Sequence, residues 1–256
     1  RFDKDRSDII ERAKSNGVSH FVVTGTSIKE SQKALALCQE YPHLLSCTAG
    51  VHPHDADHVT SHYLDEIRLL AEHESVKAIG ECGLDFNRNF SAPEQQLDVF
   101  SEQVSLAIEL QKPLFLHQRD AFDPWLAIVK PAIGKVPAMV AHCFTGNEAE
   151  LKQCLALDMY IGITGWLCDE RRGQSLRDII HHIPLNRLMI ETDAPYLTPR
   201  TIKPKPKSSR NEPAYLPYIV RAIAEITGYT EDEIVSQTRL NSASVFNLKQ
   251  ELDRVI

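Results

Sequence analysis

Short apolar runs alternate with longer amphipathic stretches along most of this chain. A short run bounded by turn-prone residues is typical of a buried strand, whereas apolar residues at helical spacing are typical of a helix that packs on such a strand. Each run is followed by a stretch of the second kind. The runs predict seven strands: His20–Val23, Ser46–Ala49, Lys77–Glu81, Pro113–His117, Ala138–His142, Met159–Ile163 and Arg187–Thr192.

Helical periodicity separates these strands. The first helix is predicted over Asp5–Asn16, and it ends at Gly17, a residue well suited to a helix C-terminus. The other predicted helices are Lys29–Glu40, His62–Glu74, Pro93–Gln111, Ala121–Gly134, Glu148–Leu157, Gln174–His182, Pro213–Thr227 and Glu231–Leu248. Strict alternation of strand and helix implies parallel strands joined by helical crossovers, which makes this an α/β fold.

A (β/α)₈ barrel, the TIM-type fold, accounts for this pattern if one more strand precedes Arg1. We therefore expect the printed sequence to begin after the first strand of the barrel. Because 256 residues suit such a barrel without further division, we predict a single domain over residues 1–256. Catalytic side chains in such barrels lie at the C-terminal ends of several strands. We therefore expect the catalytic residues of this chain at those positions.

Composition and charge narrow the class of protein. The net charge of −7 argues against a protein that coats duplex DNA through one broad basic face, although a local basic groove is compatible with it. The six cysteines form no CxxC pair and suit a reducing compartment. No apolar stretch approaches the roughly 20 residues that a membrane span needs. We expect a cytoplasmic protein that does not enter a membrane.

Four of the predicted strands end on a side chain that can ligate a metal. These residues are Glu81, His117, His142 and Asp193. One such residue at a strand end is more often structural, but four at equivalent positions of a repeating pattern favour a shared site. Imidazole nitrogens and carboxylate oxygens without thiolate suit Zn²⁺, Mn²⁺ or, if water and substrate oxygens complete the shell, Mg²⁺.

Residues next to these four include two cysteines and two further histidines. Cys82 and Cys143 directly follow Glu81 and His142, so on a strand they would point to the opposite face and are excluded as ligands. His52 lies just past another strand and is expected to contact substrate or to orient a ligand. His54 is assigned to a turn or a helix cap.

Four motifs in chain order carry a resemblance to a known family. They read AGVHPH over residues 49–54, IGECGLD over residues 79–85, HCFTG over residues 142–146 and ETDAPY over residues 191–196. Together they resemble the TatD family of metal-dependent hydrolases over nearly the whole chain. The stretches at residues 80–91 and 161–172 are most similar to its bacterial deoxyribonuclease branch.

The resemblance implies a metal-dependent barrel enzyme that cleaves phosphodiester bonds from the 3′ end of single-stranded DNA and also of RNA, with a role in DNA repair. It places Glu81, His117, His142 and Asp193 on metal and catalytic positions, and His52 on another active-site position. Asp193 would ligate the ion or accept a proton from the attacking water. Mg²⁺ is the first choice of ion, with Mn²⁺ or Zn²⁺ as alternatives. Because the His-x-His pair of many members is absent near residue 1, the number of ions stays open.

Substrate contacts are expected on loops at the same end of the strands. Arg119 could neutralise a phosphate oxygen, and a solvated salt bridge is an equally good reading of it. The basic segment over residues 200–211 could bind along the backbone of a single nucleic-acid strand, mainly through Lys203, Lys205 and Arg210. Trp166 is expected in an exposed loop, where it could stack on a base.

Other functions use the same residues. A metal-dependent deacylase or another amidohydrolase-type enzyme acting on ester or amide bonds could carry this ligand set, because a fold does not determine the bond cleaved. A protein that only binds nucleic acid or a partner, with a structural metal, is the non-enzymatic alternative. The basic segment favours a phosphate-rich substrate, and we expect a monomer.

Overall fold

The computed structural model describes residues 2–248, which gather into two compact units. Within the described residues, the first unit takes in the chain up to Ser19, together with Cys143–Ala156 and Tyr160–Ser242. The second unit takes in His20–His142, Leu157–Met159 and the residues from Ala243 onward. The prediction of a single domain over the whole chain stays a prediction.

A parallel sheet forms the centre of the second unit. Its strands are β1 (Phe21–Val23), β2 (Leu45–Ala49), β3 (Val76–Asp85), β4 (Leu114–Arg119) and β5 (Met139–Ala141). Each strand pairs in parallel with the next one in the chain. This order is what helical crossovers between consecutive strands produce. The predicted parallel strands are confirmed in this unit.

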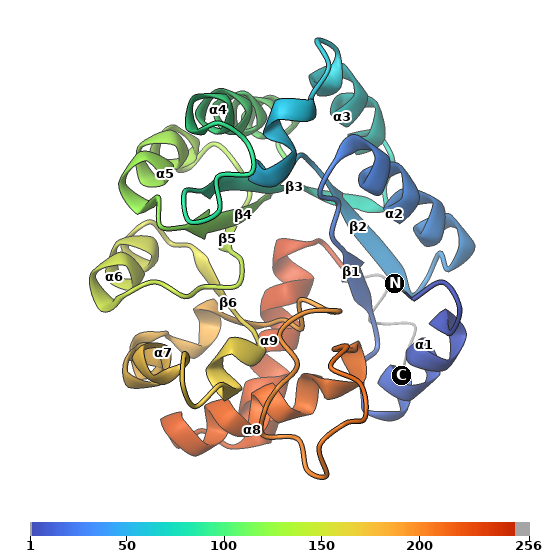
Figure 1. Ribbon diagram of the computed structural model, residues 1–256, viewed down its shortest axis with the longest axis vertical. Coiled ribbons are helices and arrows are strands. Elements are labelled where there is room, and N and C mark those ends of the chain that lie inside the picture. Colours follow the sequence, from blue (N-terminus) through green and yellow to red (C-terminus); the bar gives the residue numbers. More distant parts are fainter. Residues whose placement is uncertain (1, 249–256) are drawn as a thin grey trace. The chain divides into compact units, whose positions relative to one another are not determined.

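Helices cover the outer side of this sheet (Figure 1). They are α2 (Ile28–Glu40), α3 (Tyr63–Ala71), α4 (Pro93–Leu110) and α5 (Phe122–Val129). The 3₁₀ helices η1 (Pro53–His58) and η2 (Lys130–Ala132) lie in the connections after β2 and after α5. Helix α2 begins where the Ser27 side chain accepts a hydrogen bond from the Glu30 N–H at 3.2 Å. Helix α4 begins with Pro93 in its first turn, where a missing N–H costs nothing. Buried apolar side chains such as Phe100 and Leu116 fill the space between helices and sheet.

The first unit has a smaller parallel pair, β6 (Tyr160–Ile163) and β7 (Leu188–Ile190). Its helices are α1 (Arg6–Ser15), α6 (Glu148–Ala156), η3 (Gly165–Cys168), α7 (Gln174–Ile179), η4 (Ile180–His182), η5 (Leu185–Arg187), η6 (Pro213–Tyr215), α8 (Leu216–Thr227) and α9 (Glu231–Val245), the last ending in the second unit. Helix α1 ends at Ser15, and Gly17, two residues later, has a φ of 85° that only glycine adopts freely. Arg12 of α1 holds Glu212 beside η6 through a two-pronged ion pair, with its shortest distance at 2.7 Å.

The seven predicted strands and nine predicted α-helices are found in the described residues, with ends that shift by a few positions. Three features differ from the prediction. Pro53–His58 forms a 3₁₀ helix where only a turn or cap was expected, and Gly165–Cys168 forms another where an exposed loop was expected. Strand β3 continues four residues past Glu81 to Asp85, because Gly83 lets its backbone lie against the carbonyl of His117.

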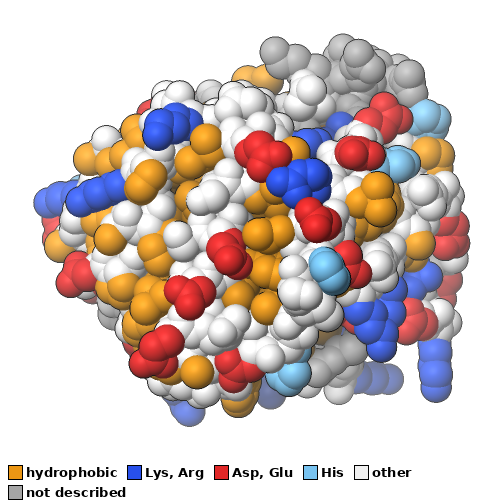
Figure 2. All heavy atoms as spheres, turned by 90° about the horizontal axis from the view of Figure 1, so that it is seen from above, with side chains coloured by type: hydrophobic (Ala, Val, Ile, Leu, Met, Phe, Trp, Pro, Cys, Tyr) orange, Lys and Arg blue, Asp and Glu red, His pale blue; other side chains and the backbone are white. Residues whose placement is uncertain are grey.

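No helix among residues 2–248 combines the length and apolar character needed to cross a membrane. On the face seen in Figure 2, acidic and basic side chains are interspersed among apolar ones. No broad basic face is seen from this side among the described residues.

Candidate metal centre

Glu81 is brought to the centre of the second unit by an irregularity in strand β3. The register between β3 and β4 shifts by one residue between Ile79 and Cys82, so the segment with Gly80 and Glu81 forms a β-bulge. A bulge turns a side chain out of the regular alternation of a strand. The adjacent Gly80 has φ 141°, and a Cβ there would lie 2.2 Å from the carbonyl oxygen of Phe115. Glycine therefore permits the backbone path that directs Glu81.

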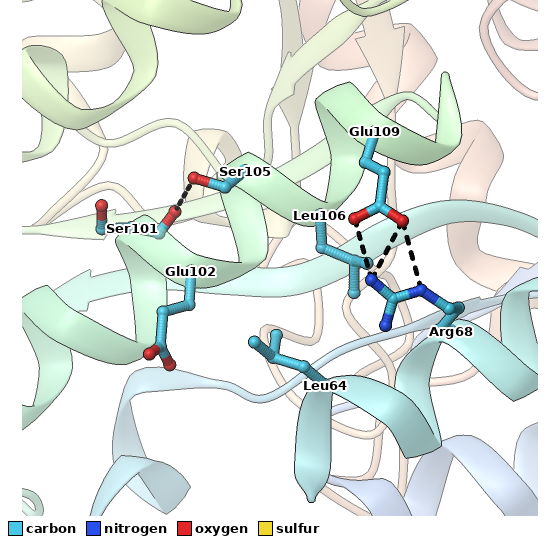
Figure 3. A pocket seen from close by; sticks show the side chains of 7 residues that line it. All are labelled: Leu64, Arg68, Ser101, Glu102, Ser105, Leu106 and Glu109. Carbon is cyan, nitrogen blue, oxygen red and sulfur yellow. Dashed lines mark hydrogen bonds and ion pairs between the residues drawn. The ribbon is translucent and has the colours of Figure 1, made fainter.

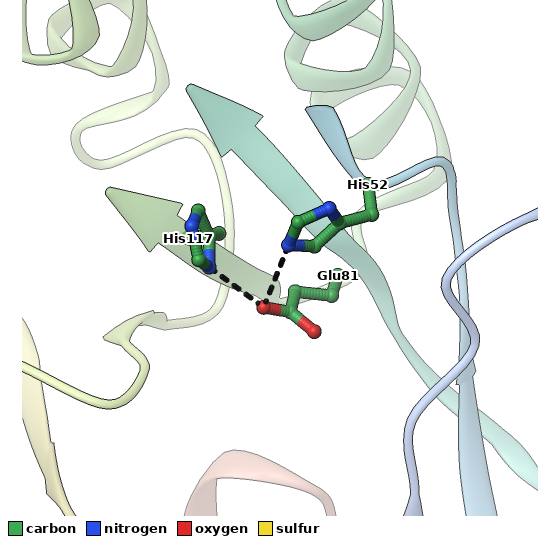
Figure 4. Close-up of side chains that lie close together, drawn as sticks. All are labelled: His52, Glu81 and His117. Carbon is green, nitrogen blue, oxygen red and sulfur yellow. Dashed lines mark hydrogen bonds and ion pairs between the residues drawn. The ribbon is translucent and has the colours of Figure 1, made fainter. Parts of the chain in front are cut away.

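Three imidazoles surround the Glu81 carboxylate. Its Oε1 atom lies 2.9 Å from Nδ1 of His117, 3.5 Å from Nε2 of His52 and 3.7 Å from Nε2 of His142. Figure 4 shows His52, in the connection after β2, and His117, on β4, turned toward that oxygen. We call His52, Glu81, His117 and His142 the metal-capable cluster.

The donor atoms of this cluster fit a divalent ion. Metal–ligand bonds of about 2.0–2.2 Å place adjacent ligand atoms roughly 3 Å apart around one ion. The separations in the cluster match that spacing, and one nitrogen or oxygen of each of His52, Glu81 and His117 lies within 4.8 Å of the other two. The cluster is therefore a candidate metal site, and it shares Glu81, His117 and His142 with the predicted set of ligands.

Electrostatics keep the Glu81 carboxylate in the anionic form that binds a cation. Burial acts to raise the pKa of Glu81, but the imidazoles of His142, His52 and His117 together hold it below its usual range. Burial lowers the pKa of His52 to about 3, so this imidazole is neutral at pH 7. Glu81 thus presents an anionic oxygen in a site from which water is largely excluded.

His52 carries its ring proton on the nitrogen that faces the site, because the other ring nitrogen accepts a hydrogen bond. It caps helix η1, where its Nδ1 atom accepts a hydrogen bond from the His54 backbone N–H at 3.1 Å. A backbone N–H can only donate, so the proton of the neutral ring is on Nε2, the atom that faces Glu81. An N–H donor is not a metal ligand. Although the distances alone include His52 among the ligands, this hydrogen bond makes it a donor.

Residues beyond the cluster fix the His52 backbone. The side chain of Gln103, fully buried in α4, accepts from the Val51 N–H at 2.7 Å and donates to the Val51 carbonyl at 3.0 Å. The His52 N–H itself donates to the carbonyl of Thr26 at 2.8 Å. These bonds hold the turn after β2 so that His52 faces Glu81.

Asp85 joins His54 to the cluster and was missed as a site residue in the sequence. Its Oδ2 atom lies 2.6 Å from Nε2 of His54 and 3.8 Å from Nε2 of His117. Burial acts to raise the pKa of Asp85, but its contacts with His117 and His54 and a backbone N–H keep that pKa well below its usual range. The signal was present, since Asp85 ends a strand four residues after Glu81. To assign Asp85 to the site from the sequence, the end of β3 would have had to be predicted at residue 85 and not at Glu81.

Asp193 belongs to the first unit, three residues past the end of β7. Its φ is 55°, a left-handed conformation that aspartate and asparagine tolerate better than most residues. The buried Asn211 side chain donates to the carbonyls of Thr192 at 2.8 Å and of Tyr196 at 2.7 Å, and so holds the chain on both sides of Asp193.

Glu191 also lies at this strand end and was not predicted as a site residue. It accepts a hydrogen bond from the Cys143 N–H at 3.0 Å. Its carboxylate lies so close to Gly162 that a Cβ there would be 2.3 Å from Oε1. The sequence contained the residue within the ETDAPY motif, but only the packing against β6 shows what it contacts.

Removing the side chain of Asn211 should misplace Asp193. We expect Asn211→Ala to lower the free energy of unfolding by about 1–3 kcal/mol, because two backbone carbonyls lose the buried side chain that donates to them, and to lower kcat as well. Asn241→Ala is the matched control, since buried Asn241 donates in the same way to the carbonyls of Leu185 and Leu188 at the other end of β7. Denaturant unfolding and steady-state kinetics on both variants check this. An equal loss of kcat in both would remove Asn211 from any positioning role.

The side chains predicted to contact substrate differ in their present ion-pair partners and in their exposure to solvent. Arg210 pairs with Asp5, so a phosphate would have to displace that carboxylate. Lys203 and Lys205 are exposed. Arg119 ends β4 with its Nε 3.9 Å from Asp120, and lies two residues past His117, a spacing that puts both side chains on one face of the strand.

Trp166 does not lie in an exposed loop, contrary to the prediction. It is half-buried in the 3₁₀ helix η3. Its Nε1–H donates to the Arg172 carbonyl at 3.2 Å, and the Arg172 guanidinium lies 4.4 Å from the ring centroid. One face of the indole is therefore already occupied by a cation.

A hollow between helices α3 and α4 is distinct from the metal-capable cluster (Figure 3). Its volume is about 220 Å³, and it is lined by Leu64, Arg68, Ser101, Glu102, Ser105, Leu106 and Glu109. Arg68 is paired with Glu109, at 2.8 Å. With its one lining cation neutralised and a second carboxylate at Glu102, this hollow is poorly suited to a phosphate.

Comparisons with known proteins agree on one family. Residues 1–247 match the family described as TatD related DNase. A relative from Pectobacterium carotovorum, described as the 3′-5′ ssDNA/RNA exonuclease TatD, is 51% identical over 248 residues, covering 97% of this chain and 95% of the relative.

Solved structures agree with this match. A TatD homologue from Escherichia coli K12 superposes with a TM-score of 0.86 at 27% identity, covering 96% of this chain and 93% of that one. A hydrolase of the TatD family from Entamoeba histolytica superposes with a TM-score of 0.84 at 30% identity, covering 93% and 88%. These likenesses confirm the predicted TIM-type barrel architecture, of which the described residues contain seven strands.

Proposed function

Because the chain belongs to the family of TatD related DNases, we propose that it is a metal-dependent nuclease that shortens single-stranded DNA and RNA from the 3′ end. The observation that carries this proposal is the Glu81 carboxylate with three imidazole nitrogens within 3.7 Å of one oxygen. Relatives about half identical over their whole length bear the name of such an exonuclease, which supports the direction and the substrates.

Glu81, His117 and His142 would hold the ion. A divalent cation held by these residues would lower the pKa of a water and neutralise the anionic oxygens of a phosphodiester. We propose Mg²⁺, with water and substrate oxygens completing its shell; Mn²⁺ and Zn²⁺ are the alternatives that imidazole ligands favour.

His52 would act on the substrate through its Nε2–H. That proton faces the site, and the ring cannot turn it away without losing the bond from the His54 N–H. A fixed N–H beside an anionic site can donate to a non-bridging phosphate oxygen, where charge develops during hydrolysis. This role agrees with the substrate contact predicted for His52 from the sequence.

Asp193 would accept the proton from the attacking water or ligate the ion. Its place past the end of β7 supports this role, since catalytic groups of barrel enzymes follow their strands. Arg119, Lys203 and Lys205 would contact the phosphate backbone of the nucleic acid. Arg210 and Trp166 would add further contacts if the substrate displaces their present partners, Asp5 and Arg172. A role in DNA repair stays a prediction from the resemblance, and a monomeric state stays a prediction as well.

Digestion of end-labelled oligonucleotides tests this function. Metal-free protein is incubated with 3′-labelled and 5′-labelled single-stranded DNA and RNA, and Mg²⁺, Mn²⁺ or Zn²⁺ is added back separately. The 5′ label should pass through a ladder of progressively shorter products, and the 3′ label should appear at once as a mononucleotide. Absence of cleavage with every ion, together with hydrolysis of an acyl ester, would replace the nuclease by the deacylase alternative.

A further inference from the structure

Phe90 is a large apolar side chain left in solvent close to the metal-capable cluster. It is 63% exposed, and its ring lies in edge-to-face contact with His54, with the centroids 4.7 Å apart. The His54 ring in turn lies 4.3 Å from the ring of His52. A contiguous series of rings thus leads from the cluster to an open aromatic surface.

The loop that carries Phe90 is fixed on both sides. Before it, Asp85 Oδ1 accepts a hydrogen bond from the Arg88 backbone N–H at 3.0 Å. After it, buried Ser91 donates its hydroxyl to the His54 carbonyl at 3.0 Å. The exposure of Phe90 is therefore a property of a defined loop conformation that two buried side chains hold in place.

An exposed aromatic ring on a fixed loop contributes little to folding, because its apolar surface stays in water. It is well suited to binding, since a ring already held in place loses little conformational freedom when a ligand covers it. The guanidinium of Arg88 lies 5.9 Å from the ring centroid and adds positive charge beside it. A flat apolar surface next to a cation matches a nucleobase and its phosphate.

We propose that Phe90 stacks on one base near the 3′ end of a single-stranded substrate, with Arg88 beside the neighbouring phosphate, and so seats the scissile bond at the metal-capable cluster. This inference rests on the proposed nuclease function and adds a base-binding subsite to it. It requires a base at one position and is tolerant of which base, because every base has an aromatic face.

The test compares wild-type protein, Phe90→Ala and Phe90→Trp on oligonucleotides with a single abasic nucleotide at the first, second or third position from the 3′ end. In the wild type, the abasic nucleotide at one of these positions should lower kcat/KM about 10-fold, the scale of one base stacking on an aromatic ring. For Phe90→Ala, kcat/KM on the intact oligonucleotide should fall by about the same factor. An abasic nucleotide at that position should then lower kcat/KM no further. Phe90→Trp should restore the loss of kcat/KM that the abasic nucleotide causes in the wild type. Tyr229→Ala, which removes an exposed aromatic ring in the turn after α8, serves as the control.

Failure of this subsite is distinguishable from failure of the nuclease function. Hydrolysis of bis(p-nitrophenyl) phosphate, a phosphodiester without a base, reports the chemistry alone, and Phe90→Ala should lose far more on the oligonucleotide than on this compound. If the wild type cleaves neither substrate, the proposed function is wrong. If it cleaves both and Phe90→Ala retains the full abasic penalty, or if no position shows a penalty in the wild type, the stacking role of Phe90 is wrong.

Discussion

Glu81→Gln is expected to reduce phosphodiester hydrolysis by on the order of a thousandfold, the scale of losing a principal electrostatic contact in an active site. Glutamine keeps the volume of the side chain but removes the anionic oxygen on which three imidazoles converge. Without that charge, a divalent cation faces only neutral nitrogen ligands. We therefore expect the thermal stabilisation that Mn²⁺ gives the wild type through binding to the folded state to be lost in the variant.

Circular dichroism and thermal melts with and without Mn²⁺ check this result beside the kinetics. Glu212→Gln is the matched control, because Glu212 is also a buried carboxylate but pairs with Arg12 of helix α1. It should lose stability and keep both turnover and the Mn²⁺-induced shift in melting temperature. Full activity of Glu81→Gln would remove this carboxylate from the mechanism.

Asp193→Asn is expected to lower kcat by about 10²–10⁴-fold, the range for losing a general base. Asparagine suits this position, because the left-handed backbone at φ 55° is tolerated by both residues and the change removes only the charge. If Asp193 accepts a proton, the Mn²⁺-induced stabilisation should persist in the variant. If Asp193 ligates the ion, that stabilisation should weaken together with kcat.

Asp158→Asn is the control for this second prediction. Asp158 has φ 60° and lies just before β6, at the N-terminal end of a strand, where barrel enzymes do not place catalytic groups. The same substitution in the same backbone conformation should leave turnover unchanged. Equal kinetics for Asp193→Asn and the wild type would exclude Asp193 from catalysis.

The strands and the positions of their C-terminal ends could be predicted from the sequence, because buried parallel strands are short apolar runs and their ends carry the polar residues. Glu81 and His117 were found in this way and lie together in the structure. His52 was assigned to substrate, and the hydrogen bond that it accepts from the His54 N–H gives a physical reason for that role.

Other features depend on contacts that sequence patterns do not record. The pair between Arg210 and Asp5 joins residues far apart in the chain, so the sequence could suggest a phosphate contact for Arg210 but not the carboxylate that already occupies it. Asp85 and His54 meet only because β3 extends past Gly83 and the turn after β2 forms a 3₁₀ helix. The β-bulge at Gly80 and Glu81 likewise follows from pairing with β4, which no local pattern predicts.

The most direct test of the metal-capable cluster as the reaction centre is an anomalous difference map from a crystal of the wild-type protein soaked in Mn²⁺. We expect a peak about 2.0–2.3 Å from a carboxylate oxygen of Glu81 and from a ring nitrogen of His117 and of His142. Nε2 of His52 should lie outside coordination distance. A peak elsewhere in the protein and none at Glu81, in crystals of an enzyme that Mn²⁺ activates, would contradict the assignment.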